Sequence, residues 1–466
     1  MLFSSIPFLY YFLPVVLILY FIVPKVLKNS VLLISSLFFY AWGEPKYVFL
    51  MTATILIGYI LGILIDKYRG NKLSRVFMIA SVVIFLGFLG YFKYTDFFID
   101  SFNKATGMSI ELLKIALPIG ISFYTFQILS YTIDVYRGDV KAQKNPINLG
   151  AYITMFPQLI AGPIVRYSDI EIQLQERSHS ISKISQGITR FTLGMGKKII
   201  LANTLGEVCT AFAVSGDKSV IFYWLYAAAF SLQIYFDFSG YSDMAIGLGK
   251  ILGFDFLENF NYPFISKSIS EFWRRWHMSL GYWFRDYVYI PLGGNRVNKG
   301  RYIFNVLVVW ALTGFWHGAA WNFVIWGLYF AVFLTLEKFW LGKHLKKNDI
   351  LARIYVIIFI LISFVIFNAT SMSDAVTCIG GMFGIGVDKF ISTETVYYLR
   401  SYGVVILAGI VGATPIVKNV VLKIKENKQF NKIINILEII VVIGIILICT
   451  AYLVDGSFNP FLYFRF

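Results

Sequence analysis

Residues 268–296 read SISEFWRRWHMSLGYWFRDYVYIPLGGNR, and residues 305–330 read NVLVVWALTGFWHGAAWNFVIWGLYF. Each stretch carries one of the chain's four histidines. The first predicts an amphipathic helix with an aromatic face, because residues of one kind recur at helical spacing. That face comprises Trp273, Trp276, His277, Leu280 and Phe284. The histidine on it therefore needs a reason to be there.

The second stretch places His317 inside an apolar run from Val306 to Phe333, which is long enough to span a bilayer. An ionisable group at membrane depth is costly to desolvate, so it is a candidate for function. Gly314 and Gly318 flank it and allow backbone or a ligand to approach closely. A histidine that is bonded to a neighbouring carbonyl and serves only packing remains the alternative.

The composition predicts a membrane protein. Hydrophobic residues make up 58% of the 466 residues, and charged residues only 14%. The net charge of +15 is spread over short loops between apolar runs, which argues against nucleic-acid binding. Cys209, Cys378 and Cys449 have no paired spacing, so neither a zinc site nor a disulfide framework is expected.

Apolar runs separated by basic loops predict a multi-pass protein of one membrane-embedded domain over residues 1–466. The clearest runs cover 6–23, 30–43, 48–65, 76–92, 354–370, 400–417 and 432–454. Lys67, Arg69, Lys72 and Arg75 crowd one short loop, which should be cytoplasmic and place the N-terminus outside.

Two irregular stretches and two further histidines complete the pattern. Proline and glycine at 118–120 and 157–163 predict broken helices packed inside the protein. His179 and His344 lie in polar segments and are expected to be solvated loop residues.

Several strings resemble the membrane-bound O-acyltransferase (MBOAT) family. FWRRWH and GFWHGAAWN surround the two histidines, and FRDYVYIPLGGNR between them resembles the bacterial alginate O-acetyltransferase branch. YAWGEP, LPIGISFYTFQILSYTIDVYRG and YFDFSGYSDMAIGLGKILGFD extend the resemblance along the chain.

The resemblance implies an all-α polytopic membrane protein in the bacterial cell membrane. Its expected form is an MBOAT-like bundle of about eleven transmembrane helices, with re-entrant or interfacial helices around a central tunnel. His317 matches the family's invariant catalytic histidine and would act as general base. His277 matches a position where other branches carry asparagine or aspartate, which suits hydrogen bonding better than proton transfer.

Five further residues are candidates for substrate binding: Arg274, Arg275, Trp316, Asn322 and Asp237. A guanidinium is well shaped to bind the phosphates of coenzyme A, although arginines at a membrane interface more often act as anchors. For Asp237, acceptor binding and structural packing between close helices are both open. No metal site is expected.

The implied function is transfer of an acyl group, most simply acetyl, from a cytoplasmic thioester such as acetyl-CoA. The donor is a substrate, and no bound cofactor is expected. The recipient would be an extracytoplasmic polysaccharide, reached directly or through an extracytoplasmic acetyltransferase partner. D-alanyl transfer to teichoic acid from an acyl carrier protein is the alternative within the family. A secondary transporter is the alternative outside it, although no internal repeat is visible.

Overall fold

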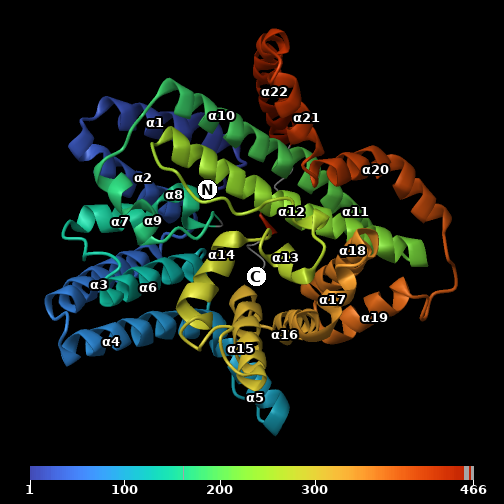
Figure 1. Ribbon diagram of the computed structural model, residues 1–466, viewed down its shortest axis with the longest axis horizontal. Coiled ribbons are helices and arrows are strands. Elements are labelled where there is room, and N and C mark those ends of the chain that lie inside the picture. Colours follow the sequence, from blue (N-terminus) through green and yellow to red (C-terminus); the bar gives the residue numbers. More distant parts are fainter. Residues whose placement is uncertain (161, 456–460, 463–466) are drawn as a thin grey trace. The chain divides into compact units, whose positions relative to one another are not determined.

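The structure is a computed structural model that describes residues 1–160, 162–455 and 461–462. All regular elements in this part of the chain are helical (Figure 1). The chain forms two compact units. Unit 1 comprises Met1–Phe191 and Met244–Leu257, and unit 2 comprises Thr192–Asp243 and Glu258–Phe466.

Within the described residues, eight helical segments are long and apolar enough to cross a membrane. They are Lys25–Gly43, Val48–Lys67, Lys72–Thr106, Val220–Ile251, Trp321–Leu345, Asp349–Asn368, Thr393–Gly412 and Phe430–Val454. Other apolar helices, such as Pro7–Ile22, are shorter. The prediction of an all-α multi-pass membrane protein is confirmed.

Unit 1 is built mainly from the N-terminal helices. They are η1 (Pro7–Phe12), α1 (Leu13–Ile22), η2 (Lys25–Leu27), α2 (Lys28–Gly43), α3 (Val48–Lys67), α4 (Lys72–Leu89), η3 (Gly90–Tyr94), α5 (Thr95–Thr106), α6 (Ile121–Arg137), α7 (Pro146–Thr154), α8 (Phe156–Leu159) and α9 (Tyr167–Gln175). Helix α10 (Ile181–Gly196) and helix α12 (Val220–Ile251) contribute residues to both units.

The described residues of the two stretches predicted to be broken helices interrupt the helices of unit 1. Gly120 precedes α6 with φ at 77°, and a Cβ there would lie 2.8 Å from the carbonyl oxygen of Leu159. The chain then breaks at Met155, between α7 and α8, where every residue from Leu149 to Leu159 is buried. Such backbone is tolerated at membrane depth only inside protein.

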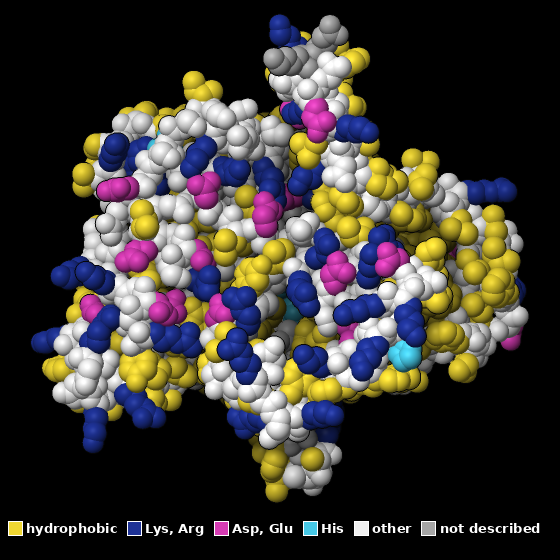
Figure 2. Space-filling view, in the orientation of Figure 1, with side chains coloured by type: hydrophobic (Ala, Val, Ile, Leu, Met, Phe, Trp, Pro, Cys, Tyr) yellow, Lys and Arg dark blue, Asp and Glu magenta, His cyan; other side chains and the backbone are white. Residues whose placement is uncertain are grey.

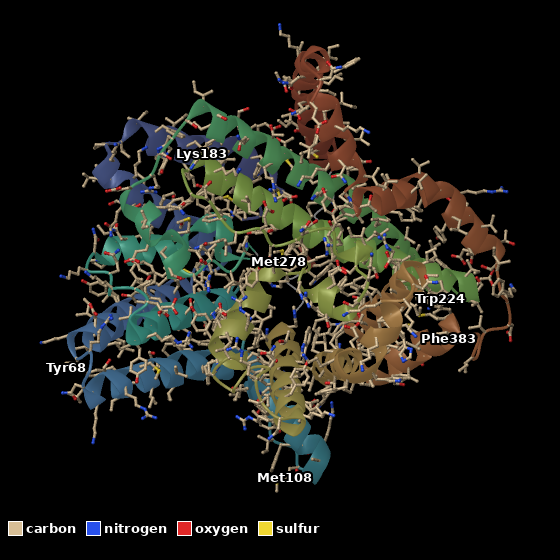
Figure 3. All side chains as sticks on the ribbon, viewed as in Figure 1. Tyr68, Met108, Lys183, Trp224, Met278 and Phe383 are labelled. Carbon is tan, nitrogen blue, oxygen red and sulfur yellow. The ribbon has the colours of Figure 1, made fainter. Side chains whose placement is uncertain are left out.

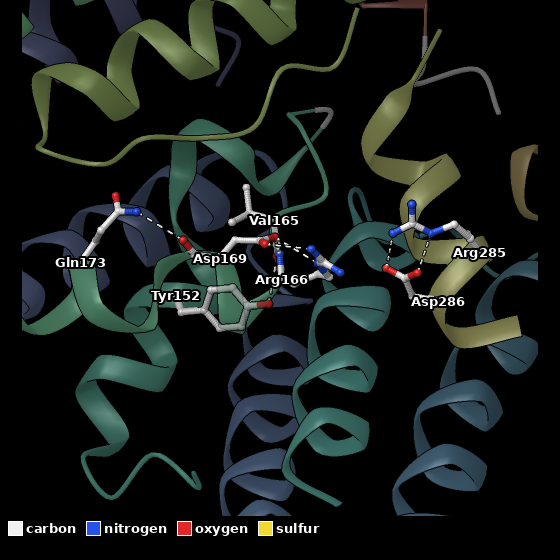
Figure 4. A network of polar contacts seen from close by, with 7 residues as sticks. All are labelled: Tyr152, Val165, Arg166, Asp169, Gln173, Arg285 and Asp286. Atoms are coloured by element: carbon white, nitrogen blue, oxygen red, sulfur yellow. Dashed lines mark hydrogen bonds and ion pairs between the residues drawn. The ribbon is translucent and has the colours of Figure 1, made fainter. Parts of the chain in front are cut away.

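Polar contacts order the segment after this break. The Oη of Tyr152 donates to the carbonyl oxygen of Val165 at 3.0 Å, and Arg166 forms an ion pair of 3.0 Å with Asp169 (Figure 4). Asp169 also accepts from the backbone N–H of Arg166 and so closes the first turn of α9. The stretch 165–169 is therefore held by its own side chains.

His179 differs from its expectation as a solvated loop residue. Its ring packs on Tyr20 and Phe21, and its Nε2 lies 3.2 Å from the Tyr20 hydroxyl. Tyr20 donates its proton to the carbonyl oxygen of Leu252 at 2.6 Å. His179 thus packs against α1 through aromatic contacts that the polar composition of its segment does not predict.

Unit 2 contains the remaining helices. They are η4 (Lys197–Ala202), α11 (Asn203–Val214), η5 (Pro263–Ile265), α13 (Ile269–Trp273), α14 (Met278–Phe284), η6 (Arg285–Tyr289), α15 (Lys299–His317), α16 (Trp321–Leu336), η7 (Glu337–Leu341), α17 (Gly342–Leu345), α18 (Asp349–Asn368), α19 (Met372–Met382), α20 (Thr393–Gly412), α21 (Ile416–Lys425) and α22 (Lys428–Val454).

The core of unit 2 is aromatic and forms around α12. Trp224 on this helix lies beside Phe383, with ring centroids 5.9 Å apart, and its indole N–H donates to the carbonyl oxygen of Met382 (Figure 3). Helix α20 instead exposes apolar side chains, among them Val404 and Leu407, and hydrophobic surface covers this part of the molecule (Figure 2). An exposed apolar helix face is expected where lipid replaces water.

Candidate active site

The segment around His277 is two short helices and not the single amphipathic helix that its periodicity predicts. Helix α13 ends at Trp273, and His277 adopts the left-handed conformation, with φ at 45° and ψ at 52°. A residue with that φ cannot continue an α-helix. His277 instead precedes α14, whose first residue, Met278, marks this point in Figure 3.

Backbone pairing with residues 259–261 stabilises this break. The N–H of Met278 donates to the carbonyl oxygen of Asn259 at 3.0 Å, and the N–H of Asn261 donates to that of Arg275 at 2.9 Å. A left-handed non-glycine residue costs about 1–3 kcal/mol and persists only where its surroundings determine it. The segment before α13 supplies those surroundings.

His277 is buried, with 1% of its surface exposed. The ring of Phe238 lies edge-on at 4.7 Å between centroids, and that of Trp316 lies at 5.9 Å. Burial lowers the pKa of His277 to about 3, so the imidazole is neutral near pH 7. Its Nδ1 lies 3.2 Å from Oδ1 of Asn259, whereas its Nε2 has no hydrogen-bond partner among the described residues.

His317 is the last residue of α15, and the apolar run around it is divided into a helical hairpin of α15 and α16. Glycines bring the two helices together. A Cβ on Gly314 would lie 2.2 Å from the carbonyl oxygen of Phe323, and one on Gly327 would lie 2.1 Å from that of Trp310. Gly314 therefore makes room for the backbone of the second helix of the hairpin. The sequence predicts close approach of either backbone or a ligand at this glycine, and the contact observed is with backbone.

Aromatic rings surround His317, which is 5% exposed. The ring centroids of Trp316, Trp326 and Phe367 lie 4.9, 5.1 and 5.5 Å from that of the imidazole. Trp316 contacts both His317 and His277. Two histidines, one at the end of α15 and one just before α14, thus lie against one buried indole, and aromatic rings surround both.

The two arginines beside His277 differ. Arg275 forms an ion pair of 2.9 Å with Glu271 and donates to the carbonyl oxygen of Asn261 at 3.1 Å, so it joins α13 to the preceding segment. Arg274 is exposed, and its guanidinium makes no hydrogen bond or ion pair within the described part of the chain. Only Arg274 has a guanidinium that is available to an anionic ligand.

Asp237 and Asn322 make structural contacts. Asp237 is buried on α12, forms an ion pair with buried Lys198, and accepts from the N–H of Leu462 at 2.9 Å. Asn322 donates to the carbonyl oxygen of Ala369 at 3.1 Å and so ties the start of α16 to the end of α18. The packing alternative for Asp237 has direct support in these contacts.

Sequence reasoning missed two residues that shape the site. Asn259 contacts His277 directly, but no motif marks it. Glu337 accepts from the N–H groups of Ile269 and Ser270, at 2.5 and 2.9 Å, and so caps the start of α13. A carboxylate inside the apolar surroundings of residues 321–341 was the available signal for Glu337.

In this helical membrane protein, a histidine at a helix end and a second buried histidine contact one indole, an arrangement suited to proton transfer away from water. The MBOAT, membrane-bound O-acyltransferase family, model matches residues 38–373. The chain belongs to this family and is a multi-pass membrane O-acyltransferase.

The relatives cover most of the chain. The probable alginate O-acetylase AlgI of Azotobacter vinelandii is 38% identical over 100% of both chains. The probable alginate O-acetylase AlgI of Pseudomonas aeruginosa is 44% identical over 83% of this chain and 75% of its own. The peptidoglycan O-acetyltransferase of Helicobacter pylori is 34% identical over 83% of this chain and 80% of its own.

Proposed function

We propose that this enzyme transfers an acetyl group from a cytoplasmic thioester, acetyl-CoA, to a hydroxyl of an extracytoplasmic polysaccharide. The transfer is completed directly or by a partner acetyltransferase outside the membrane. The route across the bilayer through a central tunnel belongs to this proposal.

One observation carries the proposal: His317 and His277, distant in sequence, both lie against Trp316 in a buried aromatic site. Acyl transfer to a hydroxyl needs a proton acceptor and exclusion of the water that would hydrolyse the thioester. Histidine is the side chain whose ordinary pKa suits proton transfer near neutrality. The aromatic rings around His317 supply the exclusion of water.

In the proposed reaction, His317 accepts the proton of the attacking hydroxyl while the hydroxyl oxygen forms a bond to the carbonyl carbon of the thioester. The carbon–sulfur bond then breaks, and the proton passes to the departing thiolate. The products are an O-acetyl ester and a free thiol. His277 binds a substrate group by hydrogen bonding, and Arg274 meets the phosphates of the donor.

The relatives support acetyl over D-alanyl as the transferred group. Those above, named for O-acetylation of alginate or peptidoglycan, align with 83–100% of this chain. Both named acceptors are extracytoplasmic polysaccharides, and this supports the class of acceptor without naming the sugar. Membership of an acyltransferase family also weighs against the transporter alternative.

The test is His317→Gln in purified protein with radiolabelled acetyl-CoA, with transfer normalised to folded protein. Glutamine hydrogen bonds but does not usefully accept a proton near neutral pH. We expect transfer to fall by about 10²–10⁴, the usual contribution of a general base. His344→Gln is the matched control, because His344 lies on the exposed α17.

Two outcomes would contradict the proposal. Turnover of His317→Gln within a few-fold of the wild-type rate would remove His317 as the base. Transfer from a D-alanyl carrier protein but not from acetyl-CoA would replace the proposed donor.

A further inference from the structure

One buried nitrogen of His277 has no partner in the part of the chain that the structure describes. Nε2 is inaccessible to solvent and makes no hydrogen bond among the described residues, whereas Nδ1 lies 3.2 Å from Oδ1 of Asn259. An unpaired buried polar atom costs about 1–3 kcal/mol, so its presence needs an explanation. The ring nitrogen that carries the proton determines which kind of partner Nε2 needs.

The side-chain amide of Asn259 can be oriented without ambiguity. Its Oδ1 lies 3.2 Å from the backbone nitrogen of Ser279, and a backbone N–H is always a donor. The Ser279 hydroxyl donates to the same oxygen at 2.9 Å. Rotating the amide by 180° would set its NH₂ group against a backbone N–H, donor against donor. The atom facing His277 is therefore an acceptor.

An acceptor beside Nδ1 determines the tautomer of a neutral imidazole. The ring contact at 3.2 Å is a hydrogen bond only if Nδ1 carries the proton. Nε2 is then unprotonated, and its lone pair is the unpaired group.

We propose that Asn259 is a positioning residue that selects the Nδ1–H tautomer of His277 and thereby presents Nε2 as a buried hydrogen-bond acceptor for an O–H or N–H of the bound substrate other than the attacking hydroxyl, whose proton goes to His317. The role of that substrate group rests on the proposed function, whereas the tautomer does not. A substrate O–H or N–H that donates to Nε2 satisfies it, so substrate binding removes the cost of the unpaired nitrogen.

The placement of Asn259 suits this role. Its side chain is 0% exposed, and its own carbonyl oxygen accepts from the N–H of Met278 at 3.0 Å. The same residue therefore holds the backbone on the far side of His277 and the ring itself. Because His277 has a left-handed backbone, both restraints act on a residue with little freedom to adjust.

The test is nitrogen NMR of purified protein in lipid nanodiscs, with the imidazole nitrogens of histidine labelled with ¹⁵N. A His277→Asn sample identifies the His277 signals by their loss. We expect wild-type protein at neutral pH to show a protonated Nδ1 and an unprotonated Nε2. A wild-type ring with its proton on Nε2 overturns the proposal, whatever any variant does.

Two substitutions at Asn259 test the cause. Asn259→Asp keeps an acceptor beside Nδ1 and should retain the Nδ1–H signal and most of the transfer activity. Asn259→Ala removes that acceptor and should give a detectable Nε2–H population with transfer at least about tenfold lower. Ser279→Ala, at the start of α14, is the matched control, because the backbone N–H of residue 279 still orients the amide and the tautomer should not change.

The spectroscopic result stands apart from the reaction. A pure Nδ1–H tautomer in Asn259→Ala would show that Asn259 does not select it. A correct tautomer pattern in protein that does not transfer acetyl from acetyl-CoA would leave the role of Asn259 intact and refute the proposed function alone.

Discussion

At the residue scale, the two histidines of the site are held in place by different contacts. His317 ends a helix and lies among aromatic rings, whereas His277 occupies a strained backbone position and is bonded to Asn259 through one ring nitrogen. The functional atom of His277 is then Nε2, the more distant nitrogen from the backbone. This distinction separates two amide substitutions at His277.

His277→Gln should retain more transfer activity than His277→Asn. The glutamine amide reaches the depth of Nε2 and offers an acceptor oxygen there, whereas the asparagine amide reaches only Nδ1. We expect a difference of about tenfold, the worth of one hydrogen bond. The measurement is acetyl transfer per folded molecule for both variants and for His277→Ala.

The left-handed backbone at position 277 favours asparagine over glutamine, so it acts against the predicted order of activity. Asparagine tolerates the left-handed conformation better than glutamine does. A more active glutamine variant therefore cannot be explained by easier folding. Equal losses of 10² or more in both variants would indicate that His277 transfers a proton.

At the element scale, the α15–α16 hairpin places His317. Its close packing depends on glycines at the helix contact, because any Cβ at Gly327 would overlap the carbonyl oxygen of Trp310. His317 lies at the end of α15, so a shift of α15 against α16 would move its imidazole relative to the rings of Trp326 and Phe367.

Gly327→Ala should lower the Tm of the detergent-solubilised protein. Overpacking of a close contact costs about 1–3 kcal/mol. Gly444→Ala is the matched control, since Gly444 is also helical and a Cβ there would meet nothing within 4 Å. That control should leave Tm unchanged or raise it, because alanine favours helix by about 0.5–1 kcal/mol. The same loss of Tm in both variants would contradict this account of the hairpin.

At the scale of the whole molecule, the orientation in the membrane remains a prediction. Helix α3 runs from Val48 to Lys67, about 30 Å at 1.5 Å per residue, which is the thickness of the hydrocarbon core. The loop after α3 is basic, and the positive-inside rule places it in the cytoplasm. Arg69 in that loop is held by Asp66 at 2.7 Å, whereas Lys72 is exposed.

Single cysteines at the two ends of α3 test this orientation. In a variant without native cysteines, Lys46→Cys should react with a membrane-impermeant maleimide in intact cells. Lys72→Cys should react only after the cells are permeabilised. The opposite pattern would invert the topology and place the donor on the other side of the proposed reaction.

The sequence by itself determined the long apolar helices and marked His277 and His317 as candidates. Long apolar runs must be helical in lipid because every backbone polar group needs an internal partner. The expected spans therefore recur, for example as α3, α18 and α20. Family strings around His277 and His317 predict a candidate site, and the roles of its residues remain a prediction.

Only the tertiary structure decided how those residues are used. The spacing of Trp273, Trp276 and His277 fits a helix, but pairing with residues 259–261 outweighs that local preference and turns His277 left-handed. Asn259 and Lys198 carry no motif, and their roles come from contacts with His277 and Asp237. The physical reason is that periodicity reports on one helix at a time, whereas the state of a buried ring nitrogen or carboxylate is determined by the atom that another segment brings against it.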